Sequence, residues 1–213
     1  GRVHGVEVCS IFHGVKPSFS ISMLDRAGSN RGGNELSPRN GKHVLYSRFS
    51  FSFMRRTGSW GNDKAYGSAI KTVGSFGTVE DFWAYYSHLV RPNDLPASTD
   101  LYLFREGILP MWEDAANKFG GRWSLRLRKG ELNQVFEYIA MGLVGEQIAH
   151  PDAVCGITAQ IRFQEDGIAV WTKNSVDLEM LNEVRDSIKR ILGDLDPSIP
   201  GKEWEFKPHV QSH

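Results

Sequence analysis

The chain has 213 residues, a length that suits one domain with a tail or two small domains. Apolar residues make up 40% and charged residues 23%, so most of the chain can fold around a core. The 25 basic and 25 acidic residues cancel to a formal charge of zero. Proteins that coat nucleic acid through its phosphates carry a basic excess, so we expect any nucleic-acid contact to be local.

Signatures of catalysis, metal binding and membrane insertion are missing from the sequence. The two cysteines, Cys9 and Cys155, lie far apart and fit no metal-ligand spacing, which favours a reducing compartment. There is no apolar run long enough to span a bilayer and no signal-peptide pattern. The nucleophile-elbow, phosphate-loop and zinc-protease motifs are also absent. We therefore predict no catalytic residue, no metal, no cofactor and no membrane partner.

The N-terminal part differs in composition from the rest. Residues 1–41 are rich in Gly, Ser, Asn and Arg and offer little to bury, which predicts a disordered tail. We expect one folded domain over residues 42–213. Its first strand covers 43–56, where phenylalanines alternate with serines and predict an aromatic face. A loop over 57–64 and a second strand over 65–76 follow.

A helix is predicted over 79–90. Thr78 opens it as the first residue of a capping box, and Pro92 prevents its continuation. Its apolar side chains form two adjacent stripes, which together are wider than a core-facing stripe needs to be. One stripe consists of Phe82, Tyr85 and Leu89, and the other of Val79, Trp83, Tyr86 and Val90. The second stripe is either buried or a docking surface.

A short strand is expected over 100–104, and a further strand over 122–129. In the latter, apolar residues alternate with Ser124 and three arginines, so the arginines share one face. That face is either solvated or lines an anion site. The arginines are Arg122, Arg126 and Arg128.

The C-terminal part is predicted to form two helices, a hairpin and a last strand. The ranges are 133–148 for the first helix, 155–173 for the hairpin, 175–192 for the second helix and 203–207 for the strand. Ser175 is the expected N-cap of the second helix. A two-residue turn at Asp166 and Gly167 would make Arg162 and Trp171 cross-strand neighbours. Antiparallel hairpins dominate this order, which predicts an α+β fold with three helices on one face of a sheet.

One loop places a tryptophan directly before an acid. In PMWEDAANKFGGRW, Trp112 offers a flat ring, and Glu113 can accept two hydrogen bonds from an edge with adjacent N–H donors. The Watson–Crick edge of guanine is such a partner, and a positively charged base adds cation–π attraction. Arginines on the same face would bind the attached phosphates. The pattern fits an alkylated guanine nucleotide, and the plain alternative is a structural Trp on a loop.

Several segments together resemble the translation initiation factor 4E family, in order and with family-like spacing, over about residues 43–209. They include HVLYSRFSF, FGTVEDFWAYYSHLVRP, PMWEDAANKFGGRW and VCGITAQIRFQEDGIAVWTK. Within the family, the chain is most similar to the subclass of the animal 4E homologous protein and the plant novel cap-binding protein. In that subclass a Tyr, here Tyr66, stands where the general form has a stacking Trp, and Phe49 likewise replaces an early-strand Trp.

The resemblance implies a fold and a ligand. It implies a curved antiparallel sheet, backed on its convex face by three α-helices, with a site for the 7-methylguanosine cap of mRNA on the concave face. Tyr66 and Trp112 would sandwich the methylated base, Glu113 would bind its edge, and Trp171 would touch the methyl group. The implied activity is the regulation of translation, by a repressor or a specialised initiation factor, in the cytoplasm and also in the nucleus.

The resemblance also implies phosphate and partner contacts. Arg122 and Arg162 match phosphate-binding positions. The convex surface around His43, Val79 and Trp83 would bind scaffold proteins like initiation factor 4G, or repressor proteins, through a Tyr-x-x-x-x-Leu-hydrophobic helix.

The chain departs from the family at several positions. Gly167 replaces a phosphate-binding Lys, for which Arg126 and Arg128 are the candidate replacements. Ser52 replaces a strand Trp behind the site, and Trp60 competes with Tyr66 for the stacking position. The alternatives left open are a protein-docking module that has lost cap binding, and an enzyme acting on capped nucleotides.

Overall fold

The computed structural model describes residues 41–56, 67–199 and 201–209, so Trp60 and Tyr66 lie outside the described residues. Within that part the chain forms seven strands, three α-helices and two 3-10 turns, and residues 67–69, predicted as strand, are also helical. The strands are β1 (Val44–Arg55), β2 (Lys71–Thr78), β3 (Thr99–Arg105), β4 (Gly121–Leu127), β5 (Val154–Ile161), β6 (Asp166–Thr172) and β7 (Trp204–Pro208). The α-helices are α3 (Val79–Tyr86), α4 (Leu132–Val144) and α5 (Leu178–Gly193), and the 3-10 turns are η3 (Pro92–Asp94) and η4 (Pro151–Ala153).

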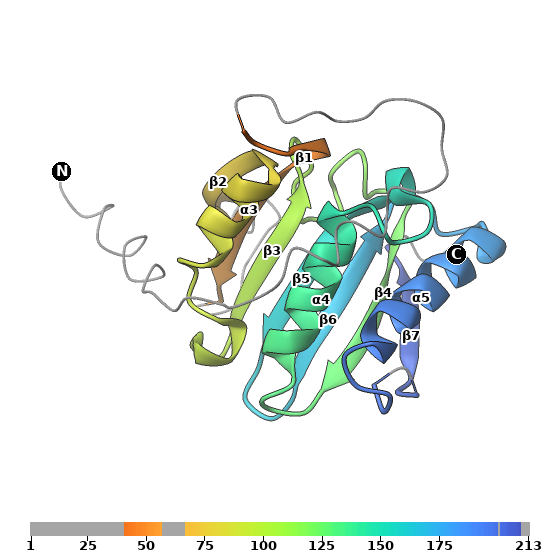
Figure 1. Ribbon diagram of the computed structural model, residues 1–213. Coiled ribbons are helices and arrows are strands. Elements are labelled where there is room, and N and C mark those ends of the chain that lie inside the picture. The colour runs from red at the N-terminus through yellow and green to blue at the C-terminus, as the bar shows by residue number, and fades with distance from the viewer. Residues whose placement is uncertain (1–40, 57–66, 200, 210–213) are drawn as a thin grey trace.

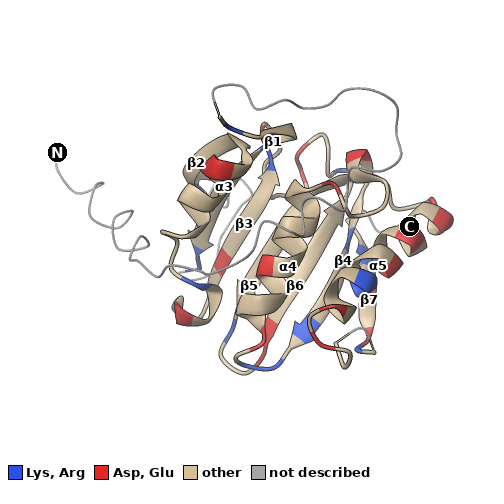
Figure 2. Cartoon of the chain, viewed as in Figure 1, with Lys and Arg blue, Asp and Glu red and all other residues tan. Residues whose placement is uncertain are grey.

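The strands form one antiparallel sheet in the order β2-β1-β3-β5-β6-β4-β7. The sheet is curved, and all three helices lie across the same face of it (Figure 1). The predicted α+β class, with three helices backing an antiparallel sheet, is therefore confirmed. Acidic segments lie on the helices, and α5 also carries a basic one, whereas the central parts of most strands carry no charge (Figure 2).

The main core lies between the sheet and the helices, and strand alternation builds it. Phe49, Phe51 and Phe53 are buried, as the alternation with serines predicts, and Phe51 packs against Tyr86 of α3 with ring centroids 6.4 Å apart. On β4 the core-facing residues are Trp123, Leu125 and Leu127. The intervening residues of each strand must then point to the concave face, opposite the helices.

Helix α3 begins as predicted, because the Thr78 side chain accepts a hydrogen bond from the Asp81 N–H at 3.1 Å. It ends at Tyr86, earlier than predicted, since the chain turns there and Leu89 already forms a bridge with another segment. The two predicted stripes are divided differently. Tyr86 is buried with Phe82, whereas Tyr85 is only half-buried.

The predicted hairpin turn at Asp166 and Gly167 is wrong. Strand β5 ends at Ile161 and β6 begins at Asp166, so the connection covers 162–165. Gln160 pairs with Gly167, and Gly156 pairs with Trp171. The physical reason is that Asp166 closes the loop through its side chain, which accepts a hydrogen bond from the Arg162 N–H at 3.1 Å.

Other boundaries moved by a few residues. The second strand begins at Lys71 rather than 65, and α4 ends at Val144, where Gly145 caps it. The N-cap of α5 is Asp177, whose carboxylate accepts from the Met180 N–H at 3.0 Å, and not Ser175. The Ser175 hydroxyl instead donates to the Phe119 carbonyl.

Gly156 is required where β5 passes behind two aromatic rings. A Cβ atom at this position would lie 2.4 Å from Cγ of Phe104 and 2.6 Å from the Leu103 carbonyl oxygen. Phe104 in turn packs edge-on against Trp171, with centroids 5.6 Å apart. A side chain at 156 would therefore disturb the concave face at Trp171.

We predict that Gly156→Ala lowers the free energy of unfolding by roughly 1–3 kcal/mol, because the backbone carbonyl cannot move away as a flexible side chain could. Gly201→Ala is the matched control, since its Cβ would meet Ser198 only at 3.6 Å, an ordinary contact. Urea unfolding followed by tryptophan fluorescence measures both variants. Equal stability of the two variants would contradict the prediction.

Candidate functional site

The concave face carries a second, smaller cluster of buried side chains. It consists of Met54, Tyr102, Phe104, Cys155, Ala169 and Trp171. Ala69, Ile70, Ile108 and Ala116 pack against this cluster from the segments after 66 and after 105. Loops thus cover one end of the concave face.

The loop with the tryptophan and the acid is held by two polar side chains that the sequence analysis missed. Asp114 accepts hydrogen bonds from the backbone N–H groups of Leu109 at 3.0 Å and Ala116 at 2.9 Å. Asn117, which is fully buried, donates to the carbonyls of Leu109 at 2.8 Å and Met111 at 2.9 Å. An aspartate or asparagine that bonds its own loop is a common turn device, but the sequence alone did not tell which polar residues here play that part.

This fixed loop presents a large aromatic ring to solvent. Trp112 is 49% exposed, and Glu113 beside it is half-buried. A Cβ atom on Gly67 would lie 3.6 Å from Sδ of Met111, so Gly67 lies beside this loop. An exposed Trp on a rigid loop is available for stacking, because little has to be ordered when a ligand arrives.

Trp171 forms the floor next to this loop. It is 6% exposed and contacts the rings of Phe104 and His209, with ring centroids 5.6 Å and 4.5 Å away. Arg122, its cross-strand neighbour, has its guanidinium carbon 5.7 Å from the Trp171 ring centroid. The predicted hairpin pairing of Trp171 with Arg162 is therefore wrong. Gly156 is the partner of Trp171 in β5, and Arg122 is its partner in β4.

His209 is a further residue that the sequence analysis missed. Its Nδ1 lies 2.8 Å from the Asn117 carbonyl oxygen, so Nδ1 carries the proton and donates. Burial lowers the pKa of His209 below its ordinary value, and the positive charge of Arg122 acts in the same direction. The imidazole against Trp171 is thus held in its neutral form.

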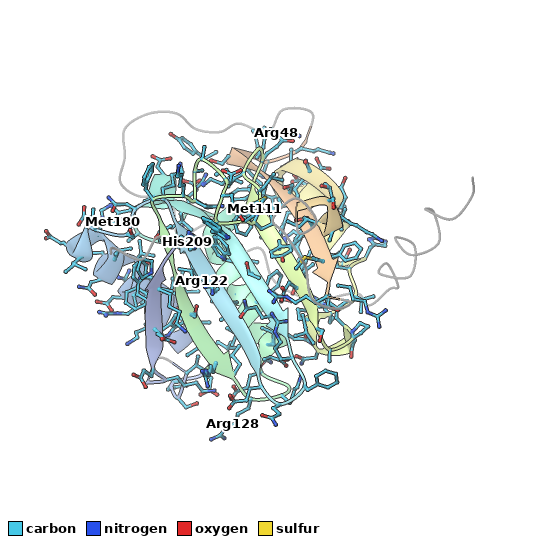
Figure 3. The ribbon with its side chains drawn as sticks, turned by 180° about the vertical axis from the view of Figure 1, so that it is seen from behind. Arg48, Met111, Arg122, Arg128, Met180 and His209 are labelled. Carbon is cyan, nitrogen blue, oxygen red and sulfur yellow. The ribbon has the colours of Figure 1, made fainter. Side chains whose placement is uncertain are left out.

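The arginines of β4 follow the predicted alternation. Arg122 is half-buried and Arg126 exposed on the concave face, where Arg126 lies opposite Gly167. Arg128 is exposed just beyond the end of the strand. Figure 3 shows Met111, His209 and Arg122 near one end of this face and Arg128 near the other.

The Arg162 side chain is held by an ion pair with a buried acid, Asp100. Its Nη2 lies 2.7 Å from Oδ1 of Asp100, and its Nη1 donates to the carbonyls of Thr99 and Ile161. Asp100 is 1% exposed and also accepts from Nε of Arg56 at 3.0 Å. The contacts of Asp100 with Arg56 and Arg162 were not predicted, because in the sequence Asp100 is only an acid at the start of an apolar strand.

On the opposite face, α3 and the start of β1 meet. The His43 N–H donates to Glu80 at 2.9 Å, and the Val79 N–H donates to the His43 carbonyl at 2.9 Å. Trp83 is half-buried and contacts Phe82 edge-on, with centroids 5.1 Å apart. The structure therefore brings His43, Val79 and Trp83 together on the helix side of the sheet.

The described part of the chain was compared with the requirements of a metal site, a reactive thiol and a membrane helix. Among these residues no group of three His, Cys, Asp or Glu side chains could hold a metal ion. Burial raises the pKa of the Cys155 thiol to about 12, which leaves it protonated at neutral pH. In the same part of the chain, no helix has the length and apolar character that a membrane crossing requires.

These features define an antiparallel sheet protein whose concave face carries aromatic and cationic side chains. A family profile described as Eukaryotic initiation factor 4E matches residues 44–213. The chain therefore belongs to the eukaryotic initiation factor 4E family, as the sequence motifs predicted.

Individual relatives and solved structures of this family are similar to the chain over most of its length. The chain is 40% identical over 197 residues to the translation initiation factor NCBP of Oryza sativa subsp. japonica. The aligned residues cover 92% of this chain and 83% of that protein. It is 37% identical to translation initiation factor 4E-4 of Caenorhabditis elegans, over 70% of this chain and 71% of that one. A solved complex of C. elegans eIF4E-3 with the 4E-binding protein Mextli and a cap analog superposes with a TM-score of 0.70 at 31% identity, covering 79% of this chain and 93% of that chain.

The neutral His209 leads to a prediction about stability and pH. The folded chain lowers the pKa of His209 below the ordinary value of 6.5. Below pH 6.5 the His209 imidazole is therefore protonated more readily in the unfolded chain than in the folded chain. The free energy of unfolding should therefore fall as pH drops from 7.5 to 5.5, by at most about 1.4 kcal/mol per pH unit from this group. His209→Phe keeps a ring against Trp171 and should show a shallower fall in urea unfolding. If the free energy of unfolding fell equally steeply with pH in the wild type and in His209→Phe, His209 would not be the group responsible.

Proposed function

We propose that the chain binds the 7-methylguanosine cap of mRNA and regulates translation, without catalysis. The observation that carries the proposal is the exposed ring of Trp112 beside Glu113, on a fixed loop above the same face that bears Trp171 and Arg122. Solved structures of related proteins support it, since one contains a cap analog and another, from Ascaris suum, the m2,2,7G cap at 28% identity and a TM-score of 0.70.

Recognition of the methylated base follows from its charge. Methylation makes the guanine ring cationic and its N1–H more acidic, which strengthens both stacking and the hydrogen bonds to Glu113. Stacking contributes roughly 1–3 kcal/mol per base, and a charge-assisted hydrogen bond adds roughly 1.5–3 kcal/mol. Trp112 supplies one ring of the sandwich and Tyr66 the other. Trp171 takes the methyl contact, and neutral His209 beside it adds no positive charge that would repel the base.

The phosphates of the cap would lie along the arginines. Arg122 beside Trp171 is the first contact, and Arg162, held by Asp100, is the second. Arg126 lies opposite Gly167 and so stands next to the position where the family has a lysine. Arg128 follows at the end of the strand and offers a further cation.

Other functional assignments rest on the same family. The surface at His43, Val79 and Trp83 is the proposed docking site for scaffold or repressor proteins with a Tyr-x-x-x-x-Leu-hydrophobic helix. One related structure contains the 4E-binding protein Mextli. We further propose that residues 42–213 form the cap-binding domain and that the protein acts in the cytoplasm.

A docking module without cap binding is the second candidate, favoured by Gly167 and Ser52. Gly167 removes a cation, and Ser52, which pairs with Tyr102, is 6% exposed on the concave side of β1. The first test below separates this candidate from cap binding, because such a module would not be retained by the cap.

We predict that the protein is retained on 7-methyl-GTP resin and eluted by 7-methyl-GTP but not by GTP. Glu113→Ala should weaken binding roughly 10- to 100-fold through loss of the charged hydrogen bonds, and Trp112→Ala should abolish retention. Phe119→Ala is the control, because Phe119 is 70% exposed near the same loop. Normal binding by Glu113→Ala would show that the edge assignment is wrong.

The same resin assay identifies which residue stacks on the base opposite Trp112. Tyr66→Ala and Trp60→Ala are compared, and loss of retention identifies the residue that completes the sandwich. Release of any product from 7-methyl-GTP during incubation would favour an enzyme instead.

Partner docking gives a separate prediction. Trp83→Ala should abolish binding of a synthetic peptide with the Tyr-x-x-x-x-Leu-hydrophobic motif, measured by fluorescence anisotropy, while retention on the cap resin persists. The reason is that Trp83 lies on the helix side of the sheet, away from the concave face. His88→Ala, an exposed position just after α3, should bind the peptide normally. If Trp83→Ala bound the peptide as tightly as the wild type, this docking site would be wrong.

A further inference from the structure

A groove with an apolar rim lies between the residues before β4 and the segment that joins β6 to α5. Its volume of about 480 Å³ falls within the range of sites that hold small ligands. Two of its side chains are apolar and exposed, Phe119 at 70% and Val176 at 82%. Leu178, in the first turn of α5, is also 70% exposed. The full lining of the groove consists of Phe119, Lys173, Asn174, Ser175 and Val176.

The backbone around the groove is fixed by hydrogen bonds. The Ser175 hydroxyl donates to the Phe119 carbonyl at 3.0 Å, which joins the two walls. The Asn174 side chain accepts from the N–H groups of Val176 at 2.8 Å and Asp177 at 3.2 Å. Asp177 in turn caps α5. A segment that covers these apolar side chains therefore has little backbone to order.

The exposure of Val176 is unusual for its position. A hydrophobic residue directly before a helix cap often packs against the fourth residue of the helix. At α5 these two positions are Val176 and Leu181. Leu181 is 2% exposed and belongs to the main core, whereas Val176 is 82% exposed, so Val176 contributes little to that contact. Its apolar surface is free to bind another segment.

The size of the groove favours a short segment over a second copy of the chain. Five residues line the groove, whereas a stable interface between two proteins uses about 20–30 residues on each side. A segment tethered to the same chain needs no high affinity, because the tether raises its effective concentration to roughly the millimolar range.

The start of β1 and the groove lie at the same end of the sheet. The register connects β1 to β4 through one row of paired residues, which are Ser50, Phe104, Gly156, Trp171 and Arg122. Phe119 comes just before β4 and Lys173 just after β6, so both lie beyond the same end of this row. The row crosses four strand spacings, about 19 Å. In Figure 3, Arg48 of β1 and Met180 of α5 both lie in the upper part of the molecule, and Arg128 lies at the bottom.

The chain before β1 contains a segment of suitable chemistry. Residues 1–40 lie outside the described residues, and the described part begins at Gly41. Within residues 1–40, no other stretch of seven is as apolar as VEVCSIF, residues 6–12, in which five of the seven are apolar. Its charged residue is Glu7, and the groove offers the exposed Lys173. The residues between Phe12 and Gly41 can span up to roughly 90–100 Å, far more than the width of the sheet.

We propose that residues 6–12 dock in this groove of the same chain. Their apolar side chains cover Phe119, Val176 and Leu178, and Glu7 lies beside Lys173. Removal of this apolar surface from water drives the contact, at about 25 cal/mol per Å². The docking is independent of cap binding, because the groove shares no residue with the proposed base and phosphate contacts.

The test uses the full chain with a nitroxide spin label on Cys9. The label is directed to Cys9 because Cys155, the other cysteine, is buried. The nitroxide should broaden the amide NMR signals of Phe119, Val176 and Leu178 and so reduce their intensity. Tyr46 is the control position, since it is exposed near the start of β1, where an undocked segment would stay closer to Tyr46 than to the groove.

Two variants remove the contact from either side. Ile11→Ser in the segment and Leu178→Ser in the groove should each restore most of the intensity of the Phe119 and Val176 signals. Leu178 is exposed, so its replacement leaves the core intact. Ile21→Ser is the matched control, because Ile21 is an apolar residue outside 6–12, and the loss of intensity should persist in this variant.

A mixed sample separates the two possible origins of the segment. Spin-labelled chains without isotope are mixed with isotope-labelled chains without nitroxide, and no loss of intensity at the groove is expected. An equal loss in the mixture would assign the segment to a second copy and overturn the proposal. Stronger broadening at Tyr46 than at the groove would overturn it as well. Relief by Ile21→Ser but not by Ile11→Ser would show that residues 6–12 are not the occupant.

Discussion

The antiparallel ladder between β4 and β6 is the constraint on which the concave face depends. Side chains alternate along a strand, so the same ladder that buries Trp123, Leu125 and Val170 under the helices must turn Arg122 and Trp171 to the other side. A shift of one residue would exchange the two sets and place an arginine in the core. Hydrophobic burial on one face thereby fixes the position of a polar site on the other.

How much of this could be predicted depends on the range of the interactions. The strand of alternating phenylalanines, the cap at Thr78 and the arginine face of β4 are local patterns, and all three are confirmed. The hairpin register could not be obtained in this way. Asp166 and Gly167 have the composition of a tight turn, but the Asp166 carboxylate bonds the Arg162 backbone and Lys129, and Lys129 comes from another strand connection. A contact over that sequence distance leaves no local signal.

The same reason explains which residues of the candidate site the sequence indicates. Trp112 and Glu113 stand out in the sequence because the pair has an unusual chemistry for a loop. Asn117 and His209, which hold the loop and cover Trp171, look like ordinary polar residues. Their function appears only when segments 92 residues apart meet through the hydrogen bond between His209 and the Asn117 carbonyl. Candidates for ligand contact can thus be proposed from the sequence, whereas the residues that position them cannot.

The order of the strands has a consequence for synthesis of the chain. Strand β7 is the last described strand to leave the ribosome, and it pairs with β4, which was made much earlier. His209 reaches Trp171 only after this pairing. A nascent chain that still lacks β7 therefore has an open edge on β4 and an indole at Trp171 that His209 does not yet cover.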